Sequence, residues 1–227
     1  MTPRHDPIPW PTDPADALAL QKELRSQVVP AGSPEPIRIA GLDAAYSADG
    51  RTIFGAAAAL ACPSLRFVEG VTAAVPVTFP YIPGLFTFRE GPALLTTLDR
   101  LSSSPDLLMV HGHGIAHPRR CGIASHLGVV TGIPSVGVAD TLLCGEAGET
   151  GALRGATAPV TEKGETIGCA VRTSPCVRPV YVSPGHLIDI AGAVRIVLLT
   201  TPRFRTPEPL RAAHRLAALA RDSAAFR

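Results

Sequence analysis

The chain lacks cysteine pairs at the spacing that metal centres and redox motifs use. Its five cysteines are odd in number and none forms a C-x-x-C pair: they are Cys62, Cys121, Cys144, Cys169 and Cys176. This pattern argues against a disulfide framework and against a zinc site built from thiolates, and it fits a reducing compartment.

Long hydrophobic runs are also missing. No apolar stretch reaches the length that spans a bilayer. Residues 1–10 are polar and rich in proline, without the apolar core of a secretory signal peptide. We therefore expect a cytoplasmic protein with no membrane partner.

The chain has little excess charge of either sign. Its formal net charge is +2 at pH 7, which neither indicates nor excludes a nucleic-acid partner. Any basic surface must be local, and three short clusters are candidates: Arg119 with Arg120, Arg203 with Arg205, and Arg211 with Arg215.

Apolar residues, by contrast, are abundant. They make up 46% of the 227 residues, and the mean hydropathy is +0.22, which is enough for a sizeable buried core. We expect a single domain over residues 1–227, in which residues 1–36 form an N-terminal helix and linker that pack on the rest.

The patterns of strands and helices outline an α/β fold. Three strand-like runs at residues 37–46, 52–62 and 65–75 are separated by turn signals, which predicts an antiparallel meander. Helices and strands then alternate, which predicts parallel strands joined by right-handed crossovers. We expect helices over about residues 15–29, 89–101, 122–130, 188–200 and 208–221, further strands at 107–110, 135–138, 165–173 and 180–182, and loops at 76–88 and 145–155. Periodicity alone supports an α/β fold in one domain; the order of the elements is also the outline of a ribonuclease-H-like mixed sheet flanked by helices.

A run of glycines and histidines follows the expected strand at residues 107–110. It begins at His111 and continues through Gly112, His113 and Gly114 to Arg120. Ligands bind just beyond the carboxyl ends of strands in open α/β sheets, so this run predicts a site.

Two acidic residues are candidates for that site. Asp43 lies within an apolar strand, where a carboxylate is unfavourable unless it is paired or bound to a metal ion; a hydrogen-bonded strand-end aspartate is the alternative. Glu90 stands at the expected start of a helix, where its charge would also complement the helix dipole.

The three histidines at 111, 113 and 117 allow a zinc interpretation. Their H-x-H-x3-H spacing is similar to that of metallo-β-lactamase-like hydrolases, but Ala116 stands where those enzymes have an aspartate. For His113, a hydrogen bond to loop backbone is the simpler interpretation.

Taken together, these segments resemble the endonuclease V family of inosine-directed repair nucleases, from about residue 41 to residue 216. The matching blocks occur in the family's order: Gly41-Leu42-Asp43, Pro80-Tyr81-Ile82-Pro83-Gly84, Phe88-Arg89-Glu90, Gly112 to Arg120, Ala124-Ser125-His126, Ile133 to Ala139, Ser183-Pro184-Gly185-His186 and Pro207-Glu208-Pro209. Any one block is weak evidence, but the ordered series is specific.

The resemblance implies a metal-dependent endonuclease that cleaves a phosphodiester on the 3′ side of deoxyinosine in DNA, in the repair of deaminated adenine. It implies Mg²⁺ as cofactor with Mn²⁺ as the alternative, DNA containing deoxyinosine as partner with RNA as a second candidate, and a monomer. Asp43 would be a metal ligand, Glu90 a further carboxylate of the site, and His214 a catalytic residue near the metal.

The resemblance also implies how the nucleic acid is held. Residues 80–84 would form a wedge that separates the strands, with an aromatic ring placed against the bases. A neighbouring pocket would take the extruded base. The residues implied in nucleic-acid binding are Tyr81, Pro83, Gly84, Gly112, Gly114, His117, Ile123 and Leu143.

Two positions depart from the family pattern. His111 stands where the family has an aspartate, and Asp140 where it has a lysine. An imidazole suits Mg²⁺ less well than a carboxylate does, and Asp140 adds negative charge facing the DNA backbone. Our hypothesis is that Asp140 supplies the carboxylate lost at position 111, so that Asp43, His111 and Asp140 form the metal set. A third departure is the run at residues 201–205, whose arginines either contact phosphate or are simply solvated.

Three functions therefore compete. The leading one is an endonuclease V-type enzyme with an altered metal preference or a reduced rate. The second is a non-cleaving binder of inosine-containing or distorted nucleic acid. The third is a zinc hydrolase built on the three histidines.

Overall fold

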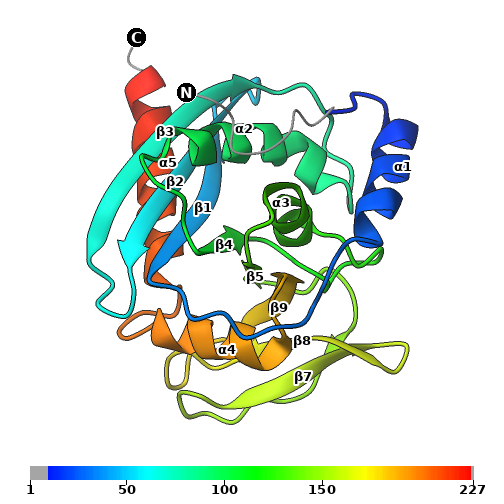
Figure 1. Cartoon of the computed structure of the whole chain (residues 1–227), viewed down its shortest axis with the longest axis vertical. Helices are drawn as coiled ribbons and strands as arrows, with labels where there is room; N and C mark the ends of the chain where they lie inside the picture. The colour runs from blue at the N-terminus through cyan, green and yellow to red at the C-terminus, as the bar shows by residue number, and fades with distance from the viewer. Residues whose placement is uncertain (1–9, 226–227) are drawn as a thin grey trace.

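The computed structural model describes residues 10–225, so the expectations for the first nine residues lie outside the described part. Its centre is a nine-stranded sheet with the order β3-β2-β1-β4-β5-β9-β8-β7-β6 (Figure 1). Only the β1–β4 and β4–β5 pairs are parallel, so the predicted mixed sheet is confirmed.

The antiparallel meander forms as predicted. It consists of β1 (Arg38–Tyr46), β2 (Thr52–Ala61) and β3 (Phe67–Pro76), and the register places Asp43 opposite Ala56. The tight turn between β1 and β2 uses Gly50, whose φ of 68° favours glycine. β1 and β2 are buried over most of their length because helices cover both faces of the sheet.

Two parallel strands follow. β4 (Leu107–His111) pairs with β1, and β5 (Ser135–Ala139) pairs with β4. The helices α2 (Phe86–Arg100) and α3 (Ile123–Thr131) precede them in turn and supply the crossovers. The carboxyl ends of β1, β4 and β5 therefore meet at one edge of the sheet.

The last four strands run antiparallel to their neighbours: β9 (Val180–His186), β8 (Glu165–Val171), β7 (Thr157–Glu162) and β6 (Glu146–Ala147). The sequence analysis missed β6 and β7 and was wrong to leave 145–155 entirely as loop. β7 contains Pro159, and proline within a strand pattern argues against a strand. The strand forms because its alternate residues Ala158 and Val160 are buried.

Two layers of helices cover the sheet. α2 and α3 pack on the face formed by Ala40, Leu42 and their neighbours, whereas α4 (Ile190–Leu199) and α5 (Glu208–Ala225) lie on the Ile39 side (Figure 1). The N-terminal helix α1 (Pro14–Arg25) is capped by Asp13, whose side chain accepts a hydrogen bond of 2.7 Å from the backbone N–H of Ala15.

Helix α2 starts earlier than predicted, and this changes the position of Glu90 in the helix. The helix begins at Phe86, three residues earlier than expected, so Glu90 lies in the second turn and is buried. It therefore does not occupy the exposed first-turn position, where it would merely complement the helix dipole.

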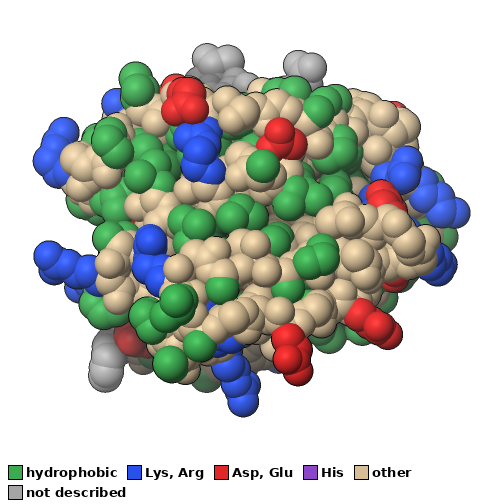
Figure 2. All heavy atoms as spheres, turned by 90° about the horizontal axis from the view of Figure 1, so that it is seen from below, with side chains coloured by type: hydrophobic (Ala, Val, Ile, Leu, Met, Phe, Trp, Pro, Cys, Tyr) green, Lys and Arg blue, Asp and Glu red, His purple; other side chains and the backbone are tan. Residues whose placement is uncertain are grey.

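Charges are dispersed over the surface. On the side of the molecule that carries α4 and β7, Lys, Arg, Asp and Glu side chains are scattered among uncharged surface (Figure 2). Among the residues from 10 to 225, no helix combines the length and the apolar character that crossing a bilayer requires.

Candidate active site

Three polar side chains meet where the parallel strands end. The β1–β4 register pairs Leu42 with Val110, so the next residues, Asp43 and His111, lie side by side. His111 Nδ1 donates to Asp43 Oδ1 at 3.0 Å, and His111 Nε2 lies 3.5 Å from Asp140 Oδ2, just beyond β5. Three of the predicted site residues are therefore brought together.

Helix α5 adds His214 to this cluster. Its Nδ1 lies 2.9 Å from Asp43 Oδ2, so both oxygens of this buried carboxylate face an imidazole. The close approach of α5 depends on Gly41, because a Cβ at that position would lie 2.1 Å from the carbonyl oxygen of Pro209. The glycine two residues before Asp43 thus sets the distance between β1 and α5.

Glu90 approaches from the opposite layer. Its side chain is buried, and burial raises its pKa to about 7, with a further contribution from the carboxylate of Asp43. Within residues 10–225, neither carboxylate forms an ion pair with a lysine or arginine. The imidazoles of His111 and His214 offset part of the charge at Asp43, and a bound cation would offset more of the charge of the two buried carboxylates.

Asp140, the second position that departs from the family pattern, forms an ion pair with Arg205. Burial alone would raise the pKa of Asp140, but the hydrogen bond and charge of Arg205 hold it below its usual value. Without a bound cation, the hydrogen bond to Asp43 raises the pKa of His111 to about 9, so a metal ion would have to displace the proton of one ring nitrogen before that nitrogen could bind it. Arg205 is thus an ion-pair partner of Asp140, a role that the run at 201–205 did not reveal because its partner lies 65 residues away.

Asp43, His111, Asp140 and His214 line a cavity of about 330 Å³, and Glu90 and Arg205 lie outside its lining. Its walls are formed by Asp43, His111, Asp140, Thr206, Leu210, Arg211, His214 and Arg215. Nearby, the guanidinium of Arg211 lies 3.6 Å from the centre of the Phe204 ring. The cavity combines carboxylates on one wall with arginines on another, which suits a substrate that carries phosphates.

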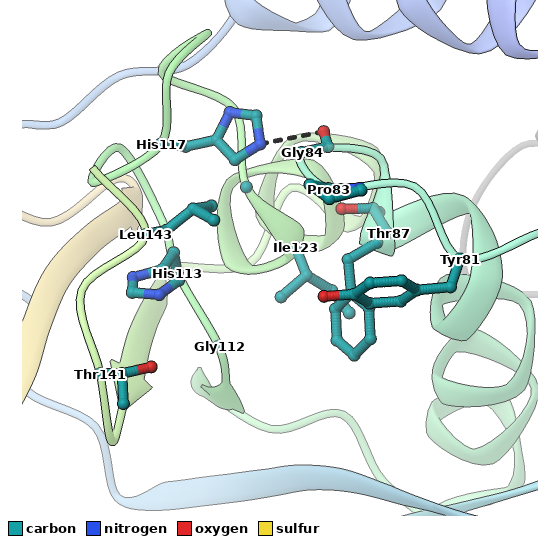
Figure 3. Close-up of a pocket in the computed structure, with 12 residues that line it drawn as sticks. Tyr81, Pro83, Gly84, Thr87, Gly112, His113, His117, Ile123, Thr141 and Leu143 are labelled. Atoms are coloured by element: carbon teal, nitrogen blue, oxygen red, sulfur yellow. Dashed lines mark hydrogen bonds between the residues drawn. The ribbon is translucent and has the colours of Figure 1, made fainter.

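A second cavity, of about 270 Å³, lies on the other side of the 111–113 segment. It is lined by Tyr81, Pro83, Gly84, Phe86, Thr87, Gly112, His113, His117, Gly122, Ile123, Thr141 and Leu143. The Tyr81 ring extends across it toward Ile123, and the His113 ring lies between Thr141 and Leu143 (Figure 3). Tyr81 is 67% exposed. Seven of the eight residues predicted to bind nucleic acid line this one cavity.

The eighth, Gly114, is not among the residues that line the cavity. A Cβ there would lie 1.9 Å from the carbonyl oxygen of Pro184, so the residue must be small for the loop to pack on β9. Its N–H donates to Ser183 Oγ at 2.8 Å. This geometry explains the glycine by packing, and its predicted contact with a base stays a prediction.

One corner of the cavity is fixed by a network that the sequence analysis missed. The carbonyl of Gly84 accepts hydrogen bonds from Gln21 Nε2 at 3.1 Å, His117 Nε2 at 3.0 Å and Arg119 Nη2 at 2.6 Å. Gln21 is fully buried in α1. No local signal marks this glutamine, because its partners come from two distant loops.

The three histidines of the zinc interpretation do not converge. His111 faces two carboxylates, while His117 uses Nδ1 to accept from the Arg119 backbone and Nε2 to donate to Gly84. Burial lowers the pKa of His113 and that of His117 to about 4. The three histidines that suggested a zinc site therefore line two different cavities: His111 lines the first, and His113 and His117 line the second.

Comparison with known proteins settles the family. The sequence profile of the Endonuclease V family matches residues 22–215. The Endonuclease V of Roseiflexus sp. (strain RS-1) is 47% identical over 210 residues, which are 92% of this chain and 94% of that protein. This chain belongs to the Endonuclease V family.

Solved Endonuclease V structures have the same fold. The enzyme of Streptomyces avermitilis superposes with a TM-score of 0.92 at 40% identity, covering 99% of this chain and 100% of that one. The Endonuclease V of Ciona intestinalis, crystallised with a 24mer DNA containing an inosine followed by a ribo-adenosine, gives a TM-score of 0.80 at 25% identity, covering 92% and 98%. The predicted family and the predicted ribonuclease-H-like fold are both confirmed.

The Endonuclease V family is generally metal-dependent, so the polar side chains around Asp43 are candidates to bind a cation. No group of three or more His, Cys, Asp or Glu side chains in the described part of the chain surrounds one point as a bound ion requires. The donor chemistry nevertheless fits, because the buried carboxylates of Asp43 and Glu90 lack a cationic Lys or Arg partner and His111 adds a nitrogen. Oxygen and nitrogen donors together favour a metal that accepts both kinds.

The raised pKa of Glu90 gives a testable pH dependence. In EDTA, the folded protein keeps this proton up to about pH 7, whereas the unfolded chain releases it near pH 4.5, the ordinary pKa of a glutamate. The native state then binds more protons between these values, so stability decreases as pH rises through this range. Glu90→Gln cannot release a proton, so we expect it to lose no stability from this cause. The melting temperature of Glu90→Gln minus that of the unsubstituted protein should therefore be several degrees higher at pH 8 than at pH 5.

Thermal unfolding in EDTA at both pH values measures this shift. Glu23→Gln, an exposed position of α1, is the matched control and should show no pH-dependent difference. A difference between Glu90→Gln and the unsubstituted protein that stays constant with pH would contradict the assigned protonation.

Proposed function

We propose that this member of the Endonuclease V family is a metal-dependent endonuclease that cleaves a phosphodiester on the 3′ side of deoxyinosine in DNA, in the repair of deaminated adenine. One observation carries the proposal: a carboxylate-lined cavity and a base-sized pocket share the segment from His111 to His113. A base held in the pocket would place its neighbouring phosphates beside the carboxylates.

The pocket and its rim suit an extruded base. The lining is mostly apolar, with Ile123 and Leu143 on its walls and the exposed ring of Tyr81 across its opening. An aromatic ring at this position can stack where a base has left the duplex. The hydrogen bonds to the Gly84 carbonyl keep the neighbouring wedge loop in place, which lowers the entropy lost on binding.

The chain's own residues have distinct roles in the proposed reaction. Asp43, Glu90 and Asp140 would hold the cation through oxygen, and His111 through nitrogen. When bound, the cation would activate water and neutralise charge on the leaving oxygen. Asp43 fixes His214 through Nδ1, so Nε2 is the ring nitrogen left to exchange a proton with the substrate. Arg211 and Arg215 line the same cavity and would contact phosphates.

The proposed ligand set differs from one made of carboxylates alone. His111 contributes nitrogen at the end of β4, and Asp140 contributes oxygen from the end of the neighbouring strand. Mg²⁺ demands oxygen ligands, whereas Mn²⁺ accepts imidazole more readily. We therefore propose that the enzyme uses Mn²⁺ more effectively than Mg²⁺.

If Asp140 is a ligand, Asp140→Asn should abolish metal binding. Its carboxylate is the one oxygen donor that faces His111 from β5, and an amide oxygen is a weaker ligand without charge. Calorimetric titration with Mn²⁺ measures the affinity, and Asp49→Asn, an exposed turn position, is the matched control. Retained affinity in Asp140→Asn would remove this residue from the ligand set.

The proposed function is tested with end-labelled oligonucleotides in Mn²⁺. A DNA duplex with one deoxyinosine, the same duplex with adenine, and an RNA with inosine at that position separate the possible substrates. We expect one product, with its end on the 3′ side of deoxyinosine, and none from the adenine duplex. Specific binding of the deoxyinosine duplex without any product would indicate a non-cleaving binder instead. Size-exclusion chromatography of the complex tests the proposed monomer.

A further inference from the structure

A buried side chain joins the N-terminal helix to the loop that carries Tyr81. Gln21 lies on α1 and has no exposed surface. Its Nε2 donates to the carbonyl of Gly84 at 3.1 Å and to the carbonyl of Cys121 at 2.7 Å, and its Oε1 accepts from Arg119 Nε at 2.5 Å. Both N–H groups of the amide and one lone pair of its oxygen are therefore used.

The orientation of this amide follows from its partners. A carbonyl oxygen only accepts and a guanidinium only donates, so the amide nitrogen faces Gly84 and Cys121 and the amide oxygen faces Arg119. Burying an amide is unfavourable unless these hydrogen bonds are made, whereas an apolar side chain would pack in α1 without any such requirement. The amide therefore specifies how α1, the loop at Gly84 and the segment from Arg119 to Cys121 lie relative to one another.

The wedge loop, residues 80–84, is held at both ends. At its start, Arg89 Nη1 donates to the carbonyl of the buried Phe79 at 2.8 Å. At its end, the carbonyl of Gly84 accepts three donors, of which Gln21 comes from α1. Between these two points the loop carries an exposed aromatic ring. A loop fixed in this way can place its ring between bases without first losing conformational freedom.

We propose that Gln21 is a positioning residue for strand separation, which holds the wedge loop in place while Tyr81 enters a base-paired duplex. This inference rests on the proposed function. Gln21 is buried and acts through the Gly84 carbonyl, so it has no contact of its own with the nucleic acid. Its loss should therefore weaken binding where base pairs must be opened, and should have little effect where the strands are already apart.

Substitution of Gln21 separates this role from packing. Gln21→Met keeps the length of the side chain without a donor, and Gln21→Glu keeps the acceptor for Arg119 but offers no donor to the two carbonyls. Leu24→Ala is the matched control, because Leu24 is buried on the same helix and its side chain forms no hydrogen bonds. All three variants lose packing or hydrogen bonds of α1, but only the first two release the wedge loop.

Two DNA duplexes distinguish the effects. One is fully paired around a single deoxyinosine, and the other has mismatched pairs on both sides of the deoxyinosine, so that it is already open. Fluorescence anisotropy in EDTA measures both dissociation constants without cleavage. The readout is the dissociation constant for the paired duplex divided by that for the open duplex.

We expect both substitutions of Gln21 to increase this ratio by about tenfold, because the hydrogen bonds that hold the wedge loop are lost. Affinity for the open duplex should change less than about threefold. Leu24→Ala should lower the melting temperature and leave the ratio unchanged. If Gln21→Met does not fold at the assay temperature, Gln21→Glu provides the same comparison.

Three results would overturn the inference. An unchanged ratio in the variants of Gln21 would show that the wedge loop does not depend on this amide, while the proposed function stands. An equal increase of the ratio in Leu24→Ala would assign the effect to the packing of α1 in general. If the unsubstituted protein binds the deoxyinosine duplex no better than the same duplex with adenine, the proposed function fails and this inference fails with it.

Discussion

Asp43→Asn should lower the rate of cleavage of a deoxyinosine-containing duplex by about 10³-fold or more, because this residue organises the whole site. Its two oxygens accept hydrogen bonds from His111 at 3.0 Å and His214 at 2.9 Å. An amide carries no charge and turns an N–H₂ group toward one of these imidazoles. The substitution therefore removes a cation ligand and misplaces His214 at once.

Single-turnover cleavage in Mn²⁺, with enzyme in excess over labelled duplex, measures this loss. Asp16→Asn changes an exposed aspartate in the first turn of α1 and should cleave at the unsubstituted rate. Binding of the duplex in EDTA should persist in Asp43→Asn, because the base pocket is untouched. A rate within tenfold of the unsubstituted enzyme would show that Asp43 is not central to the chemistry.

His111→Asp should convert the site to one that prefers Mg²⁺. The new carboxylate faces Asp43 and Asp140, so three negative groups lie together and repel one another without a cation. We expect a lower melting temperature in EDTA and an increase in Mg²⁺ affinity of at least about tenfold, since Mg²⁺ prefers oxygen ligands.

Thermal unfolding over a series of Mg²⁺ concentrations measures both effects, because a ligand that binds the folded state raises the melting temperature, and does so at lower concentration when it binds more tightly. His214→Asp is a comparison that adds a carboxylate on α5 without changing the end of β4. If Mg²⁺ raises the melting temperature of His111→Asp no more than that of the unsubstituted protein, position 111 is not a ligand. Adding Asp140→Lys to His111→Asp tests whether the two departures compensate each other.

The sequence predicted three of the residues that the structure brings together, because their meeting follows from topology. His111 and Asp140 stand at the ends of apolar runs, whereas Asp43 lies within β1, one residue beyond the last Leu42–Val110 pair with β4; the parallel strands β1, β4 and β5 bring the three together. The histidine on α5 required the family resemblance, since a polar residue on a long amphipathic helix has many possible neighbours.

Other features were out of reach because they depend on contacts between distant segments. The hydrogen bonds of Gln21 reach Gly84 and Cys121, and Arg205 meets Asp140 across a separation of 65 residues. The first turn of α2 has no capping side chain at Leu85, so its start was misplaced and the burial of Glu90 was not foreseen. Tertiary packing decides all three, and local sequence patterns do not record it.

The most direct test of the proposed function is cleavage of a labelled deoxyinosine duplex in Mg²⁺ and, separately, in Mn²⁺, with Asp43→Asn and His111→Asp assayed in parallel. A working nuclease whose metal site contains histidine should cleave faster in Mn²⁺ than in Mg²⁺, lose activity in Asp43→Asn, and gain Mg²⁺-supported activity in His111→Asp. If the unsubstituted chain cleaves in neither metal while His111→Asp does, the imidazole has removed the activity and the native protein does not act as a nuclease.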